Sequence, residues 1–328
     1  MADLTTSYMG IPVSSPVIVG ACSLSGRLST IQEIEEAGAG AMVIKSLFEE
    51  QIMAEALRLA EQLAVGSERF AESLTYFPPL EHAGPAEHLM WVAKTRKAVR
   101  MPLFASLNAV SPDGWAGFAK QLQDTGVDGL ELNLYAVQTD AERTSQDIEK
   151  DLFDTVRKVL HEVTIPVAVK LSPFYTNLIH VATELDQVGA RALVLFNRFL
   201  QPEIDEESQT LRNAMNLSRP EDARLPLRYI ALLHGRIKAD LVATTGVHHA
   251  AGVARQLLAG ATAVQVVSTL YLHGVDHLQN INAELAGWMD RHGYAAIADF
   301  RGRLSQEDVP DRFAFERAQY VELLMQQT

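Results

Sequence analysis

Apolar and polar positions along the chain repeat as one local unit. Four times, an amphipathic stretch of helical spacing is followed by glycine, a few small residues and a short apolar run. The copies begin at Gly38, Gly126, Gly189 and Gly260. Glycine just past a helix can adopt the left-handed conformation that ends it, and a short apolar run is typical of a buried parallel strand. The unit is therefore predicted to be a helix, a glycine stop and a strand.

Four more apolar runs raise the number of predicted strands to eight. Two of them follow Pro102 and Pro166, because a strand tolerates proline at its first residue. The predicted strands begin near Val17, Met42, Leu103, Leu130, Val167, Leu193, Leu241 and Val264. Eight strands alternating with helices favour an α/β fold, a closed (β/α)8 TIM barrel. The alternative is an open doubly wound sheet, which the absence of G-x-G-x-x-G after the first strand disfavours.

Two connections between predicted strands are long. Residues 47–100 contain a predicted helix, EEQIMAEALRLAEQLA, and residues 199–239 form the second long connection. Long loops after barrel strands usually cover the active-site mouth. The helical spacing at the end of the chain indicates two parts, a barrel over 1–305 and a C-terminal helical extension over 306–328.

Composition narrows the classes of partner. The chain has 328 residues, of which 48% are hydrophobic, and a net charge of −13. This acidic balance argues against nucleic acids and anionic membranes, which attract basic surfaces. Cys22 is the sole cysteine, so a disulfide framework is excluded and a reducing compartment is expected. No apolar run reaches the roughly 18 residues of a membrane-spanning helix. These features predict a cytoplasmic protein.

Polar side chains appear where the apolar runs end. They are Lys45, Ser46, Ser106, Asn108, Asn133, Lys170, Ser172, Asn197, Arg198, Thr244, Thr245, Ser268 and Thr269. The carboxyl ends of barrel strands form the active-site mouth. A buried ammonium needs a partner, so this set indicates an anionic or carbonyl-bearing ligand. The other interpretation is that these groups cap strand ends and face water. Neighbouring histidines such as His248 and His249 point in different directions on a helix, and no metal site is expected.

Eight segments, which include most of these residues, resemble the class 1 dihydroorotate dehydrogenases. They are VIVGACSLSG, AGAMVIKSLFEEQ, GLELNL, VAVKLSPF, LVLFNRF, TTGV, AGATAVQVVSTLY and GYAAIADFRGRL. The resemblance runs from about residue 5 to residue 305. It implies an FMN-dependent oxidoreductase, commonly a homodimer, that acts on a small molecule and exchanges electrons with a partner that the sequence does not identify.

The resemblance also implies roles for individual residues. Lys45 and Ser46 match the segment beside the flavin ring, and Lys170 matches the lysine near its N1–C2=O edge, where it would stabilise negative charge on reduced flavin. Asn133 matches an asparagine that faces both flavin and substrate, and Asn197 matches a substrate-binding asparagine. The remaining matches to the cofactor site are Ala21, Asn108, Thr245, Gly246 and Ser268.

The sequence departs from the family pattern at three places. Ala136 occupies the position of the catalytic cysteine and cannot accept a proton, which leaves Tyr135 as a candidate acid or base. Arg198 replaces a serine beside the substrate asparagine and can bind a carboxylate or phosphate bidentately. Thr245 stands at a glycine position of the phosphate-binding turn, where ATTG replaces GTGG.

These departures favour an altered substrate. The expected reaction is oxidoreduction at the CH–CH group of a small carbonyl or carboxylate compound other than dihydroorotate, with Lys45, Lys170, Asn133 and Tyr135 as catalytic candidates. Three alternatives remain: a non-catalytic FMN-binding or regulatory protein, a Schiff-base lyase that uses Lys170, and a barrel with no cofactor.

Overall fold

The computed structural model describes residues 2–48, 85–108, 112–134, 137–198, 202–212, 216–316, 320 and 324–325. Eight parallel strands close into a barrel, in the order β11-β12-β3-β4-β5-β6-β7-β8. The strands are β3 Val17–Val19, β4 Ala41–Phe48, β5 Leu103–Asn108, β6 Gly129–Asn133, β7 Val167–Leu171, β8 Ala192–Leu195, β11 Asp240–Thr244 and β12 Ala263–Val266. Each one contains or adjoins the position from which the sequence predicted it, so the TIM barrel is confirmed and the open sheet is wrong.

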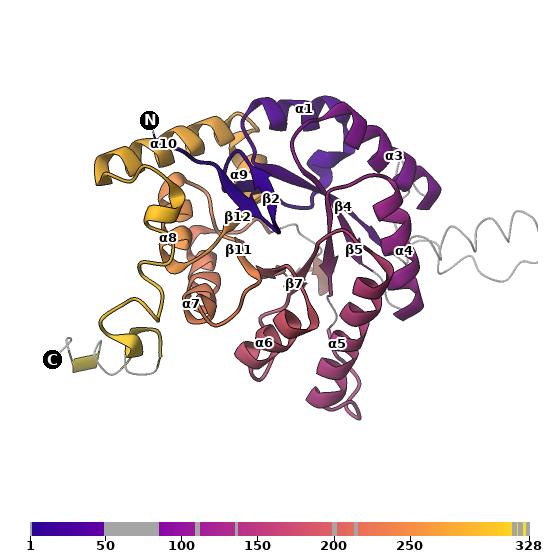
Figure 1. The fold of residues 1–328 in the computed structure, drawn as a ribbon. Coiled ribbons are helices and arrows are strands. Elements are labelled where there is room, and N and C mark those ends of the chain that lie inside the picture. Colours follow the sequence, from indigo (N-terminus) through magenta and orange to yellow (C-terminus); the bar gives the residue numbers. More distant parts are fainter. Residues whose placement is uncertain are drawn as a thin grey trace, which may run out of the picture.

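Helices cover the outside of the barrel (Figure 1). They are α1 Leu28–Glu36, α3 Pro85–Ala98, α4 Pro112–Asp124, α5 Ser145–Glu162, α6 Leu178–Val188, α7 Arg224–Leu233, α8 Ala250–Ala259, α9 Ser268–His273 and α10 His277–His292. Short 3-10 helices are η1 Ser23–Gly26, η3 Pro220–Ala223, η4 Ile297–Asp299 and η5 Arg312–Phe315. The four glycines of the repeated unit all have positive φ, from 84° at Gly38 to 118° at Gly260. The predicted glycine stops are therefore confirmed.

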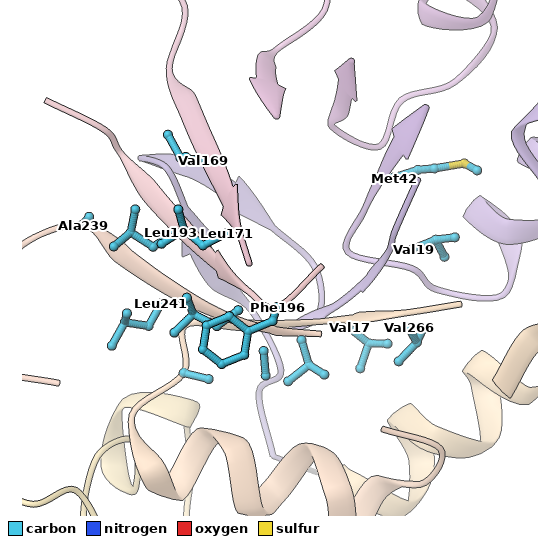
Figure 2. Packing of buried hydrophobic residues seen from close by; sticks show 14 of the residues in the cluster. Val17, Val19, Met42, Val169, Leu171, Leu193, Phe196, Ala239, Leu241 and Val266 are labelled. Atoms are coloured by element: carbon cyan, nitrogen blue, oxygen red, sulfur yellow. The ribbon is translucent and has the colours of Figure 1, made fainter. Parts of the chain in front are cut away.

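Alternating side chains of the strands divide the core into two layers. Outward residues such as Leu132, Val169 and Leu193 pack against the helices, and Figure 2 shows part of this outer layer around Val17, Leu171 and Val266. Inward residues form a second, smaller cluster inside the barrel. A strand buried on both faces reads as a continuous apolar run, which is why these strands stood out in the sequence.

Two small hairpins lie outside the barrel sheet. Strands β1 Thr6–Tyr8 and β2 Ile11–Val13 pair antiparallel, and Tyr8, Met9 and Val13 join the inner apolar cluster. Tyr8 packs edge-on against Phe104 of β5, with ring centroids 5.1 Å apart. Strands β9 Glu203–Asp205 and β10 Thr210–Arg212 lie in the long connection after β8. The sequence did not predict either hairpin.

Two predicted helical segments fall wholly or partly outside the described residues. The predicted helix EEQIMAEALRLAEQLA lies among residues 49–84, of which nothing is described. Near the end of the chain, Gln306 donates from its side chain to the carbonyl oxygen of Arg312, the first residue of η5, at 2.9 Å. The C-terminal helical extension over 306–328 stays a prediction.

Candidate functional site

A cavity of about 280 Å³ opens at the carboxyl ends of β7, β8, β11 and β12. Eight residues expected from the sequence line it: Ala21, Lys170, Asn197, Arg198, Thr244, Thr245, Gly246 and Ser268. These residues lie on both sides of one concave space, because the barrel brings strand ends that are far apart in sequence to the same rim. The cavity is therefore the candidate active site.

Lys170 lies on the cavity wall above a buried carboxylate. Its Nζ atom is 3.5 Å from Oε1 of Glu131 and 3.4 Å from Oε1 of Gln265. Gln265 in turn donates from Nε2 to Oε2 of Glu131. The side chain of Glu131 is 1% exposed and that of Lys170 is 13% exposed. The cation thus reaches the cavity, whereas the carboxylate that balances it does not.

Other sequence-predicted polar residues lie in β4, β5 and β6 and do not line this cavity. Asn197 donates to Oδ1 of Asn133 at 2.9 Å, which joins the two candidate substrate amides. Ser46 is hydrogen-bonded to Ser106 at 2.7 Å. Asn108 is buried at the end of β5. The cavity therefore lies at the ends of β7, β8, β11 and β12, while the predicted amides and hydroxyls of β4, β5 and β6 lie outside its lining.

Lys45 lies in an irregular part of β4. The register between β4 and β5 shifts between Ile44 and Leu47, and the backbone N–H of Lys45 donates to Oγ of Ser25 at 2.9 Å. Burial, with a smaller contribution from the Lys45 charge, lowers the pKa of His88 to about 4. His88 Nε2 is buried and has no hydrogen-bond partner among the described residues. His88 and Lys45 therefore lie close enough for the lysine charge to affect the histidine.

The turn after β11 lines the cavity with two residues of positive φ. Thr245 and Gly246 both have positive φ, 78° and 76°, and successive left-handed and turn conformations can direct N–H groups to one point. Ser218 approaches the same cavity and donates its backbone N–H to Oγ of Ser268 at 3.0 Å. Hydroxyl and amide donors gathered in a concave turn suit a phosphate group. The donor set thus fits the phosphate end of FMN, and the nearby Lys170 ammonium suits a carbonyl edge of its ring.

Arg198 lies at the outer wall of the cavity. Its guanidinium donates to the carbonyl oxygen of Asn216 and comes within 4.0 Å of Oδ2 of Asp222. The separation from Asp222 is at the limit of an ion pair, so the guanidinium keeps capacity for a carboxylate or phosphate ligand.

Several functional positions were not found from the sequence. Glu131 and Gln265 under Lys170 were missed, as were Asn216, Ser218 and Tyr271 on the cavity wall. The available signal for the first two was a polar residue inside an apolar run, in G-L-E-L-N and A-V-Q-V. The candidate acid Tyr135 and the neighbouring Ala136 lie outside the described residues.

Neither a metal site nor a membrane-spanning helix is found in the described parts of the chain. The rings of His249, His273 and His277 gather with centroids 4.9–6.1 Å apart, which the sequence did not suggest. Nevertheless, no group of three or more histidine, cysteine, aspartate or glutamate side chains in the described ranges could hold a metal ion. Among the described helices, none has the length and apolar character that crossing a bilayer requires.

The barrel and its cavity define the class: a TIM-barrel protein with a concave site at the carboxyl ends of its strands, lined by a lysine and an asparagine among other residues. The family model for dihydroorotate dehydrogenase matches residues 80–289, and the chain belongs to this family.

Curated relatives align over most of the chain. The catalytic subunit of dihydroorotate dehydrogenase B (NAD(+)) from Thermoplasma acidophilum is 25% identical, over 92% of this chain and 99% of the relative. The putative dihydroorotate dehydrogenase A (fumarate) from Aeropyrum pernix is also 25% identical, over 92% and 97%. Dihydroorotate dehydrogenase A (fumarate) from Limosilactobacillus reuteri is 27% identical, over 66% and 71%. The resemblance seen in the sequence is confirmed.

Proposed function

We propose that this protein is an FMN-dependent oxidoreductase that acts on the CH–CH group of a small anionic carbonyl or carboxylate compound other than dihydroorotate. The main support for the proposal is that Lys170, Asn197 and the turn at Thr245–Gly246 line one cavity. Asn197 is also hydrogen-bonded to Asn133. Bound FMN supplies a hydride acceptor or donor at its ring. The chain supplies the binding groups and the charge that favour that transfer.

The residues that would hold FMN fall into two groups, one suited to its phosphate and one suited to its ring. Backbone N–H groups of the turn at Thr245 and Gly246, with the hydroxyl of Ser268, suit the phosphate. The ammonium of Lys170 suits the carbonyl edge of the ring, since a charge-assisted hydrogen bond is stronger than a neutral one. Ala21 lies on the same cavity wall, where its small side chain leaves room for a ligand. Lys45, Ser46 and Asn108 remain candidates for the adjoining rim.

The substrate side is proposed from Asn133, Asn197 and Arg198. Amide groups of the asparagine pair can donate to a carbonyl oxygen, and the guanidinium can bind a carboxylate. Ala136 cannot serve as the base that dihydroorotate oxidation requires. Tyr135 is the candidate proton donor for the reverse type of reaction, in which a conjugated C=C bond is reduced.

Visible absorption of the purified protein, before and after addition of FMN, tests the cofactor. We expect saturable binding with the bands of oxidised flavin. Lys170→Gln should weaken FMN binding about 10–100-fold, because a charge-assisted hydrogen bond contributes about 1.5–3 kcal/mol. Lys97→Gln, on the exposed end of α3, is the matched charge control and should leave the affinity unchanged. A wild-type protein that takes up no FMN would refute the proposal.

A second experiment tests the proposed class of substrate. Protein with photoreduced FMN is mixed anaerobically with α,β-unsaturated carboxylates, and reoxidation is followed by absorbance. Arg198→Gln should raise the KM for the accepted compound at least tenfold, and Tyr135→Phe should lower its turnover. Undiminished turnover of Tyr135→Phe would remove the tyrosine from the mechanism.

Ala136 supports a second candidate, a non-catalytic FMN-binding protein. It predicts bound flavin that no member of the carboxylate panel reoxidises faster than free reduced FMN. The Schiff-base lyase has less support, because Lys170 contacts a buried carboxylate, whereas a Schiff-base lysine attacks as the neutral amine. Borohydride trapping with a carbonyl substrate would detect it.

A further inference from the structure

The polar layer beneath the cavity is a closed set of three side chains from three strands. Glu131 comes from β6, Lys170 from the adjacent β7, and Gln265 from β12, which is separated from β7 by β8 and β11. Every pair among the three is in contact: Lys170 with Glu131 at 3.5 Å, Lys170 with Gln265 at 3.4 Å, and Gln265 with Glu131. Such an arrangement fixes each member through the other two.

The hydrogen bonds within this set determine which N–H donors of Lys170 stay available for a ligand. An ammonium has three N–H donors, and Lys170 directs two of them downward, to Glu131 and Gln265. The amide of Gln265 is oriented, because its nitrogen faces the carboxylate and its oxygen faces the ammonium. Both carboxylate oxygens of Glu131 are engaged. Within the described residues, one donor of Lys170 therefore remains for a ligand in the cavity.

Because Glu131 is buried, we assign its carboxylate to pairing with Lys170 and not to contact with a substrate. Glu131 is 1% exposed and lies above the inner apolar cluster, which includes Tyr8 and Phe104. A charge there is tolerated only when it is paired and hydrogen-bonded. Burial first, then the Glu131 charge, raises the pKa of the Tyr8 hydroxyl well above its ordinary value. Lys170 and Gln265 line the cavity, whereas Glu131 does not.

We propose that Glu131, oriented by Gln265, is a positioning residue that balances and aims Lys170, and so limits how strongly the site stabilises negative charge on reduced FMN. This inference rests on the proposed function. An unbalanced cation would hold the reduced, anionic form of the flavin more tightly. With the carboxylate below it, Lys170 still orients the ring edge, but reduced FMN stays a stronger hydride donor. The balanced pair thus favours reduction of the substrate.

Glu131→Gln tests this directly, because it keeps the shape of the side chain and removes its charge. We expect the variant to bind reduced FMN, relative to oxidised FMN, at least tenfold more tightly than the wild type does. For a two-electron couple this corresponds to a rise of about 30 mV in midpoint potential. Potentials are measured by dye equilibration, and far-UV circular dichroism verifies that each variant is folded. Tyr8→Phe, a buried neighbour changed without change of charge, should keep the ratio within twofold.

A double-mutant cycle separates positioning from a direct field effect. In a Lys170→Gln background, Glu131→Gln should change the ratio by less than twofold, because the residue through which it acts is gone. Gln265→Leu should weaken binding of both redox forms several-fold, since it frees Lys170 to move. An unchanged ratio in Glu131→Gln, or an equal effect in the Lys170→Gln background, would overturn the positioning role while wild-type FMN binding keeps the proposed function. Failure of the wild type to bind FMN would overturn both.

Discussion

Thr245 occupies a backbone conformation that favours glycine, and substitutions at this position measure what the turn after β11 costs in stability. Its φ is 78°, in the left-handed region, where an L-residue costs about 1–2 kcal/mol. Threonine is β-branched, which places it in the upper part of that range. Residues held in this way concentrate at ligand sites, and Thr245 lines the candidate cavity. The expected changes in stability follow from three contributions.

Thr245→Gly removes the left-handed cost. It also adds an entropy loss on folding of about 0.5–1 kcal/mol, and it removes the hydrogen bond from Thr245 Oγ1 to the carbonyl oxygen of Phe196, 3.3 Å long, which contributes about 0.5–1 kcal/mol. The free energy of unfolding should therefore stay within about 1 kcal/mol of wild type. Thr245→Ala loses the same hydrogen bond and keeps the left-handed backbone, so it should be less stable than Thr245→Gly by about 0.5–1 kcal/mol.

Urea unfolding followed by circular dichroism measures the difference between the two variants. The matched pair is Thr244→Gly and Thr244→Ala, one residue earlier in β11, where the backbone is extended and the order should reverse. If Thr245→Ala equals or exceeds Thr245→Gly in stability, the turn is not strained in the protein and the reasoning is wrong.

Three further predictions concern neighbouring features. Gly246→Ala should lower the free energy of unfolding by more than about 2 kcal/mol and weaken FMN binding, because φ is 76° and the added Cβ would overlap the backbone of Ala223. Gly117→Ala, in an exposed turn of α4 with open space around it, should instead raise that free energy by about 0.5–1 kcal/mol, and a loss at both glycines would contradict the distinction. Burial, with a smaller contribution from the Lys45 charge, lowers the pKa of His88 from 6.5 to about 4, so its neutral ring stabilises the fold fully above pH 6.5. That contribution, roughly 3 kcal/mol, is lost as the pH falls from 6.5 to 4, and urea unfolding of His88→Gln should depend less steeply on pH over this range; equal slopes would refute the assignment.

The sequence by itself determined the barrel and most of its rim. Each helix–glycine–strand unit is local, because the left-handed glycine and the apolar run are adjacent in the chain. The strand ends are also local, so Lys170, Asn197 and Thr245 could be placed at the mouth without knowing their neighbours. The family resemblance added the flavin, since composition and spacing alone do not distinguish cofactors.

Only the tertiary structure decided which of these residues meet. Glu131 and Gln265 are 134 residues apart and share one hydrogen bond, because closure of the barrel brings β6 and β12 to the same interior layer. Likewise, Asn133 and Asn197 pair across 64 residues, while Lys45 lies at the far rim, beside His88. The inner hairpin of Tyr8 and Val13 fills the base of the barrel, a position that its short strands could not reveal. Sequence periodicity fixes which face a side chain takes, but partners across the barrel depend on strand order and register, which the whole chain sets together.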